Sequence, residues 1–176
     1  MEKVFYFGYG ANCTPEMISW ITGKDDFKGK PVMLEGWNLC VQRLDQVPRV
    51  AIPTSTGPRP LREHLREVWG DNFETYVIKP GKDKVMGTLW EMEPRDRELV
   101  KNWERVGFWY KEVRVKVKTE SGEQIEAVSE CLGDNQAVDR EVDGLNYEPF
   151  LLPREAFRIR AEGARQGYFK RMSMER

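Results

Sequence analysis

The sequence predicts an α+β protein with a small mixed, mostly antiparallel, barrel-like sheet and flanking helices. Two observations lead to this fold class. Segments with the period of strands come in runs, whereas a parallel sheet would require strict alternation of strands and helices. The chain also has 176 residues, of which 40% are hydrophobic, so it can bury the core of one compact domain.

The first elements are a strand, a glycine loop and a helix. Residues 3–9 are mostly aromatic or β-branched, as in a strand, and Gly8 and Gly10 indicate a bend or a close approach of the backbone. Thr14 suits the N-cap of a helix, the proline after it suits the first helical position, and Gly23 ends the helix.

The middle of the chain combines strands with two helices. A break rich in Pro and Gly at residues 57–60 precedes a short amphipathic helix at 61–69, where apolar residues recur at four-residue spacing. Pro94 opens a second helix that extends to about Trp103. Four further segments have the composition of strands: residues 32–43, 49–55, 73–78 and 84–92.

A hairpin, a loop and a helix complete the chain. Residues 110–119 alternate valines with charged residues, which is typical of a half-buried strand, and residues 124–132 follow as its partner across a turn. The acidic segment 133–148 has no clear period and is interpreted as a long loop, and Pro153 begins the terminal helix.

The charge and the absence of export signals argue against several function classes. The 28 Lys and Arg residues balance 29 Asp and Glu residues, so we expect no nucleic-acid partner and no membrane surface as partner. The first residues lack the apolar core of a signal peptide, and no later run approaches the ~18 apolar residues of a membrane span. We therefore expect a cytoplasmic protein. The 3 cysteines are widely spaced, which predicts reduced thiols.

The glycine loop is the first candidate binding site. The stretch GYGANC lacks the spacing of a P-loop and of a dinucleotide fingerprint. Its glycines leave backbone N–H groups accessible just before a helix N-terminus, whose dipole favours an anion such as a carboxylate. A plain strand end with its aromatic residues in the core is the alternative, and local pattern favours it.

Glu104 is the second candidate. It precedes Phe108, Trp109 and Tyr110 in the most aromatic stretch of the chain, where desolvation would raise the pKa of its carboxyl group and suit it to acid/base catalysis. The alternative is a solvated glutamate at a helix end, paired with Arg105 or a neighbouring lysine. The local pattern alone favours this alternative.

Other groups give weaker signals. His64, the only histidine, lies in a charged helical pattern and is interpreted as a solvated surface residue. Cys13 has no basic neighbour to activate it, so a buried structural thiol is the favoured interpretation over a nucleophile. The acidic residues of 134–148 lack the order of a calcium-binding loop and are interpreted as solvating that segment.

Three blocks together resemble a known family. YFGYGAN at residues 6–12 resembles the YFxYGSN signature of the γ-glutamylcyclotransferase-like proteins, also called AIG2-like or butirosin-biosynthesis-cyclotransferase-like. Residues 87–117 are similar to the family's second block, in which a strand and a helix lead to a catalytic glutamate and then a tyrosine, here Glu104 and Tyr110. Residues 156–172 resemble its terminal helix. The three blocks span nearly the whole chain.

The resemblance implies a γ-glutamyl amide cyclotransferase, an enzyme without cofactor or metal that releases 5-oxoproline and a free amine. The α-amine of the substrate attacks its own γ-carbonyl, Glu104 acts as general acid/base, and the partner is a small γ-glutamyl substrate of a monomer or homodimer. A non-catalytic small-molecule or protein-binding module with the same fold is the alternative. The implied substrate-binding residues are Tyr6, Phe7, Gly8, Tyr9, Gly10, Ala11, Asn12 and Tyr110.

Departures from the family pattern concern the substrate rather than the fold. Ala11 replaces the serine of YGSN, Gly8 a common alanine, and Arg105 and Glu112 stand where the family often has glycine and arginine. Residues 58–80 resemble an insertion within a single domain of residues 1–176; it would cover the site, contact a subunit or merely elaborate the surface. The leaving amine stays open between the cysteinyl-glycine of glutathione metabolism, a free amino acid, a polyamine and a lysine side chain.

Overall fold

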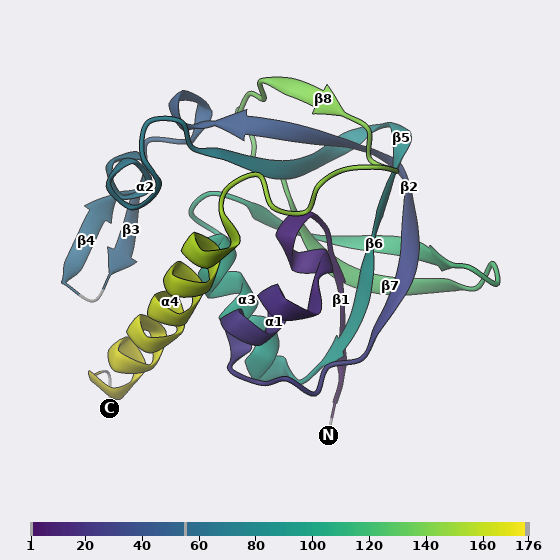
Figure 1. The fold of residues 1–176 in the computed structure, drawn as a ribbon, viewed down its shortest axis with the longest axis horizontal. Coiled ribbons are helices and arrows are strands. Elements are labelled where there is room, and N and C mark those ends of the chain that lie inside the picture. Colours follow the sequence, from purple (N-terminus) through teal and green to yellow (C-terminus); the bar gives the residue numbers. More distant parts are fainter. Residues whose placement is uncertain (1, 55, 175–176) are drawn as a thin grey trace.

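Five strands of the computed structural model, which describes residues 2–54 and 56–174, close into a barrel (Figure 1). Their order is β5-β1-β7-β6-β2, and a further pairing of β2 with β5 closes the ring. Within the described ranges only β1 and β7 pair in parallel, so the sheet is mixed and mostly antiparallel, as predicted. The strands are β1 (Val4–Gly8), β2 (Gly29–Arg43), β5 (Glu74–Met92), β6 (Lys111–Thr119) and β7 (Gln124–Cys131).

The long strand β5 corrects one prediction, because the segments 73–78 and 84–92 were expected to be two strands. They form one strand, in which Pro80 and Gly81 lie opposite a register shift of β2 between Glu35 and Trp37. A β-bulge tolerates a proline and an unpaired residue, which would interrupt a regular ladder. The residues that indicated a break therefore mark a bend.

Two short strands also lie where no strand was expected. The Pro- and Gly-rich segment forms β4 (Gly57–Pro60), which pairs with β3 (Ala51–Thr54) in a separate hairpin where prolines are tolerated because both strands are edges. The acidic segment contains β8 (Arg140–Val142) at the edge of β2. Two 3₁₀ turns, Gly10–Cys13 and Leu44–Gln46, complete the short elements.

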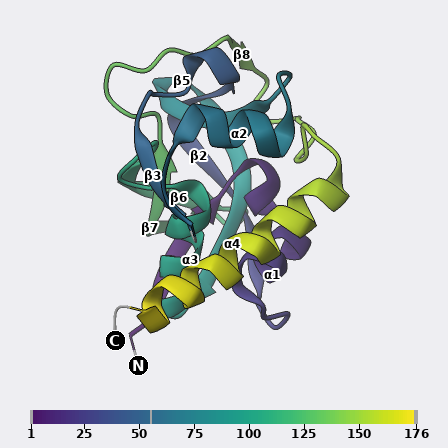
Figure 2. The ribbon, with the colours of Figure 1, turned by 90° about the vertical axis from the view of Figure 1, so that its left-hand side faces the viewer.

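Three helices cover one side of the barrel: α1 (Pro15–Thr22), α3 (Pro94–Glu104) and α4 (Arg154–Met174), with α4 packed across the other two (Figure 2). The start of α1 is as predicted: Thr14 Oγ1 accepts from the backbone N–H of Met17 at 3.2 Å, and Gly23 ends the helix with φ 77°. Apolar side chains of all three helices pack against Tyr6 and Trp90 on the outer face of β1 and β5.

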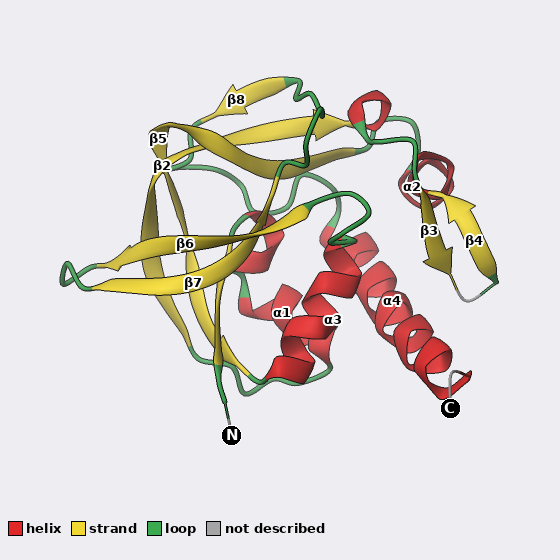
Figure 3. Ribbon diagram, turned by 180° about the vertical axis from the view of Figure 1, so that it is seen from behind, coloured by secondary structure: helices red, strands yellow, loops and turns green. Residues whose placement is uncertain are grey.

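The remaining helix, α2 (Leu61–Trp69), lies beside the β3–β4 hairpin (Figure 3), and its last turn contacts α4. Leu61 and Leu65 are its buried residues, and they pack with Phe73 and Trp109 in a second core. The four-residue spacing thus predicted the buried side of α2. Residues 58–80 comprise β4, α2 and the first part of β5.

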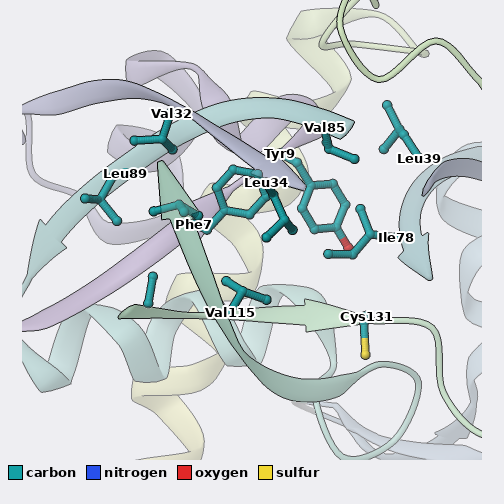
Figure 4. Close-up of a cluster of buried hydrophobic side chains, with 12 residues drawn as sticks. Phe7, Tyr9, Val32, Leu34, Leu39, Ile78, Val85, Leu89, Val115 and Cys131 are labelled. Atoms are coloured by element: carbon teal, nitrogen blue, oxygen red, sulfur yellow. The ribbon is translucent and has the colours of Figure 1, made fainter. Parts of the chain in front are cut away.

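The barrel interior is a third core, in which Phe7 and Tyr9 lie among aliphatic side chains of β2, β5 and β6 (Figure 4). Their ring centroids are 6.1 Å apart. Aromatic residues of the opening segment therefore fill the barrel. In the described part of the chain, no helix is long and apolar enough to cross a membrane.

Candidate active site

The glycine loop folds back on itself at the end of β1. A side chain at Gly8 would overlap the carbonyl oxygen of Asn12, so only glycine permits this close approach. Gly10 has φ 62°, a conformation that favours glycine. The N–H groups of Gly10 and Asn12 already have partners, the Tyr147 hydroxyl at 3.3 Å and the Tyr9 carbonyl at 3.2 Å. The glycines therefore serve the shape of the loop, rather than opening these two N–H groups to a ligand.

Asn12 connects the loop to Glu104. The side-chain amide of Asn12 donates to Glu104 Oε1 at 2.8 Å and to the Tyr6 hydroxyl at 2.9 Å. The backbone carbonyl of Asn12 accepts from the indole N–H of Trp90 at 2.8 Å. Both amide hydrogens are thus used, and the buried side chain is held in one orientation. The fold brings together two residues that lie 92 positions apart in the sequence.

Glu104 is the last residue of α3, and its side chain lines a cavity of about 270 Å³. Glu104 as a whole residue is half-buried, because part of it faces the cavity. Its carboxyl group is surrounded by protein atoms. Burial raises the pKa of Glu104 to about 8, the negative charge of Glu130 adds to the rise, and the Asn12 hydrogen bond opposes it. The expected upward shift of this pKa is present, and the group can exchange a proton near neutral pH.

A second buried carboxyl group, Glu130 on β7, was not singled out in the sequence. It accepts from the Tyr6 hydroxyl and from Arg97 Nη1 at 3.2 Å, and its backbone carbonyl accepts from the Tyr9 hydroxyl at 2.8 Å. Arg97 of α3 also pairs with Glu112 of β6 at 3.0 Å. Burial raises the pKa of Glu130, whereas the charge of Arg97 lowers it. Glu112, one of the departures from the family pattern, therefore serves this ion network.

Tyr110 brings a hydroxyl group to the same cavity. Its ring stacks on Trp109 with centroids 4.5 Å apart, and the side chain is buried. The hydroxyl lies near Thr75, but no described residue forms a hydrogen bond of good geometry with it. A buried hydroxyl without a hydrogen bond is energetically costly unless a ligand or a water molecule bonds to it. Tyr110 is therefore available to donate a hydrogen bond to a bound molecule.

Only some residues of the predicted binding loop line the cavity. Tyr9, Gly10, Ala11 and Asn12 line the cavity, whereas the first three residues of the signature do not. Of those three, Phe7 fills the barrel interior. Ala11 presents a methyl group, and its carbonyl accepts from Thr14 Oγ1 at 2.8 Å.

His64 corrects another prediction. It was expected at the solvated surface, yet it lines the cavity and its Nδ1 atom is buried without a partner in the described chain. Burial lowers the pKa of His64, and the nearby charge of Arg105 lowers it further, so the ring is neutral at pH 7. The helical pattern around it is charged, but this side of α2 faces the cavity instead of bulk water.

The cysteines lie outside this cavity. Cys13 is half-buried beside Tyr147, and burial raises the pKa of its thiol, so it is a poor nucleophile. Cys40 and Cys131 are buried and not in disulfides. Among residues 2–54 and 56–174, no group of three or more His, Cys, Asp or Glu side chains is placed to hold a metal ion.

Comparison with known proteins identifies the fold. No family model and no curated protein matches the sequence. A solved structure named gamma-glutamyl cyclotransferase aligns over 80% of this chain and 72% of its own, with a TM-score of 0.55 and 19% identity. An uncharacterized protein from Homo sapiens aligns over 98% of this chain and 86% of its own, with a TM-score of 0.58 and 16% identity.

A solution structure from Arabidopsis thaliana aligns over 100% of this chain and 95% of its own, with a TM-score of 0.50 and 16% identity. At such identities the likeness concerns the fold. The chain therefore has a γ-glutamylcyclotransferase-like fold, which confirms the fold class and the resemblance drawn from the sequence blocks.

Proposed function

We propose that this protein is a γ-glutamyl amide cyclotransferase in which Glu104 is the general acid/base. The observation that carries the proposal is the Asn12–Glu104 hydrogen bond of 2.8 Å at the wall of a cavity. It joins the loop expected to bind the glutamyl group to a carboxyl group whose pKa is raised to about 8. The shared fold with a protein named gamma-glutamyl cyclotransferase supports the same reaction class.

The reaction needs one proton carrier. The α-amine of the substrate attacks its γ-carbonyl carbon, a C–N bond of the five-membered ring forms, and the amide C–N bond to the leaving amine breaks. The attacking nitrogen loses a proton and the departing nitrogen gains one. Glu104 is mostly protonated at neutral pH, and the minor ionised form that its pKa of about 8 leaves takes the first proton and returns it to the second. Holding the glutamyl chain in a ring-closing geometry can contribute about 7 to 11 kcal/mol to the barrier reduction.

Binding of the glutamyl group falls to the loop and to Tyr110. The backbone from Tyr9 to Asn12 lines one side of the cavity, next to the start of α1, where the helix dipole favours a carboxylate. The hydroxyl of Tyr110 is the donor for the oxygen of the γ-carbonyl, on which negative charge develops as the ring closes. Tyr6 acts indirectly, because its hydroxyl is bonded to Asn12 and Glu130.

The first prediction is that Glu104→Gln lowers kcat about 100-fold to 10,000-fold, the range of a lost general acid/base. Gln has nearly the same shape but carries no exchangeable carboxyl proton. Release of 5-oxoproline is measured over a panel of γ-glutamyl amides. The matched control is Glu98→Gln, which changes an exposed glutamate of the same helix whose ion pair is with Lys101.

Two outcomes would contradict the proposal. If no amide of the panel yields 5-oxoproline with the wild-type protein, the fold serves a binding module and not this reaction. If Glu104→Gln and Glu98→Gln are equally active, the reaction stands but the proton carrier is another group, with Glu130 the nearest candidate.

A further inference from the structure

One part of the cavity wall is built from two places where the sequence departs from the family pattern. One is α2, inside the segment 58–80 that was interpreted as an insertion, and the other is Arg105, where the family often has glycine. Both line the same cavity as Glu104, together with residues of α4, and Arg105 directly follows Glu104 in the chain. In the proposed reaction this side receives whatever is attached to the departing nitrogen.

Positive charge gathers on this side of the cavity. Arg105, Arg160 and Arg171 all line it. Arg105 donates to the carbonyl of Pro53 at 3.4 Å, Arg160 to a backbone carbonyl of α2 at 3.5 Å, and Arg171 to the side-chain oxygen of Asn102 at 2.7 Å. Within the described parts of the chain, none of the three is in an ion pair with a carboxylate.

The acidic residues of the cavity do not compensate for this charge. Glu74 is bonded to Arg140, and Glu130 is paired with Arg97. Glu104 holds its proton at neutral pH because of its raised pKa. The pKa of Arg105 is lowered to about 10 by burial and by the charge of Arg171, so Arg105 is still a cation at pH 7. An anion in the cavity would meet cations that have no carboxylate partner among the described residues.

The backbone of Arg105 supports a role for its side chain. Its φ of 57° and ψ of 41° put the residue in the left-handed region, at the end of α3, where glycine is usual and a long side chain is uncommon. Strained positions of this kind cluster at binding sites. No described residue forms a stronger contact with its guanidinium than the carbonyl of Pro53, so the fold itself gives little reason for an arginine here.

The wall around these arginines is apolar and aromatic. Leu65, Val68 and Trp69 of α2 and Phe157 of α4 line the cavity here, and the rings of Trp69 and Phe157 are 4.9 Å apart. The two helices lie next to each other in Figure 2. Such a wall binds a hydrophobic body, while the cations beside it bind a negative group. A cationic amine would find no free carboxylate here among the described residues.

We infer that the leaving amine carries an anionic group on an aromatic or large apolar body, and that Arg105 binds the anion. This inference rests on the proposed function and narrows its substrates: amides of anionic aromatic amines are favoured, and amides of polyamines or lysine side chains are not. Arg105 is a specificity residue, since it touches the leaving group and takes no part in proton transfer.

The test compares three amides that share a phenyl body and differ in charge, and adds one aliphatic cationic amide. γ-Glutamyl-phenylalanine carries a carboxylate that γ-glutamyl-phenethylamide lacks, γ-glutamyl-O-phosphotyrosine adds a phosphate, and γ-glutamyl-cadaverine is cationic. We expect kcat/KM for γ-glutamyl-phenylalanine to exceed that for the phenethylamide by about tenfold or more, as for one charge-assisted hydrogen bond. A further gain with the phosphotyrosine amide would identify a doubly charged group as the preferred anion, and equal values would identify the carboxylate.

The second prediction concerns variants at Arg105. Arg105→Gln should remove most of the tenfold preference by slowing the phenylalanine amide alone, and Arg105→Lys should keep part of it. Arg114→Gln, at an exposed position of β6 outside the cavity, is the matched control and should change neither amide. An unchanged rate with the phenethylamide shows that the variant is folded.

Three results would overturn the inference. The wild-type protein could turn over the neutral or the cationic amide as well as the anionic one, or Arg105→Gln could slow both phenyl amides equally, which would assign Arg105 to the glutamyl group. The third result comes from a different experiment, which is needed if no amide yields 5-oxoproline and the proposed reaction therefore fails. Calorimetric titration of both phenyl amides then tests the anion site alone, and equal affinities for wild type and Arg105→Gln would refute it.

Discussion

Glu104 owes its proton affinity to the position of its carboxyl group at the end of α3. Burial and the charge of Glu130 favour the neutral form, and only the amide of Asn12 donates to it among the described residues. The group is therefore neutral in the resting protein, and the fold is under electrostatic strain whenever it ionises. This strain gives a test of the site that does not depend on any substrate.

The third prediction is that Glu104→Gln stabilises the protein at high pH. The carboxyl pKa is 4.5 in the unfolded chain and about 8 in the folded protein. The contribution of the protonated carboxyl group to the free energy of unfolding is thus fully present below pH 4.5 and is lost as the pH rises toward 8. The Glu104→Gln variant shows no such loss, because an amide does not ionise. We expect a gain in the free energy of unfolding on the order of a few kcal/mol at pH 8.5 and almost none at pH 4.5.

Urea denaturation at the two pH values measures this difference. Glu98→Gln, the exposed counterpart on the same helix, should show no gain that depends on pH. A gain of equal size at both pH values would mean that Glu104 titrates as an ordinary glutamate in the folded protein.

At the scale of elements, the C-terminus of α3 must satisfy two opposing requirements, one of backbone conformation and one of charge in the cavity. A helix end in the left-handed conformation favours glycine, while the cavity beside it gains a cation from Arg105. Stability and substrate choice then conflict at one residue. Such conflicts are typical of binding sites, where a local rule is broken for function.

The fourth prediction follows for Arg105→Gly. Glycine relieves the backbone strain, so we expect the free energy of unfolding at neutral pH to rise by about 0.5–1 kcal/mol. The same variant should lose the preference for anionic amides. Thermal or urea denaturation provides the first quantity and kcat/KM the second. A destabilised variant would show that the arginine side chain supports the fold through Pro53, and that its strain has a structural reason.

At the scale of the whole molecule, Arg97 joins the helical layer to the barrel. It extends from α3 to Glu130 on β7 and Glu112 on β6, and its guanidinium lies 4.8 Å from the ring centre of Tyr6 on β1. A single buried cation thus holds three strands and one helix in register around the candidate site.

The fifth prediction is that Arg97→Met lowers the free energy of unfolding by about 3–5 kcal/mol, because it leaves Glu130 buried without its cation. Adding Glu130→Gln to this variant should recover a large part of the loss, and the double-mutant cycle measures the coupling. Loss of less than 1 kcal/mol in the single variant would mean that Glu130 takes up a proton at little cost.

The sequence predicted the fold class and most elements, because strand alternation and helix caps are local signals. It could not single out Glu130. Glu126 and Glu130 are the same residue type on the same side of β7, yet Glu126 is exposed and Glu130 is buried under the helical layer. Only the packing of α3 distinguishes them, and no local pattern encodes it.

His64 illustrates the same limit. Its charged helix predicts a solvated side chain, and it takes the distant α4 and Arg105 to turn that side of α2 into a cavity wall. The loop and Glu104, by contrast, were found because separate blocks of the sequence resemble one family, although each is ambiguous alone. Their roles in binding and catalysis remain predictions.

The Asn12–Glu104 and Tyr6–Glu130 bonds also bear on how the protein folds. They join residues 92 and 124 positions apart, and among the described residues β1 pairs with β5 and β7, which lie far from it in the sequence. During synthesis the opening segment leaves the ribosome first and must wait for β5 and β7 before it has a strand partner. A truncated chain that ends before β7 would lack the strand that joins β1 to β6 in the barrel, and Glu130 with it, so catalysis would report complete folding.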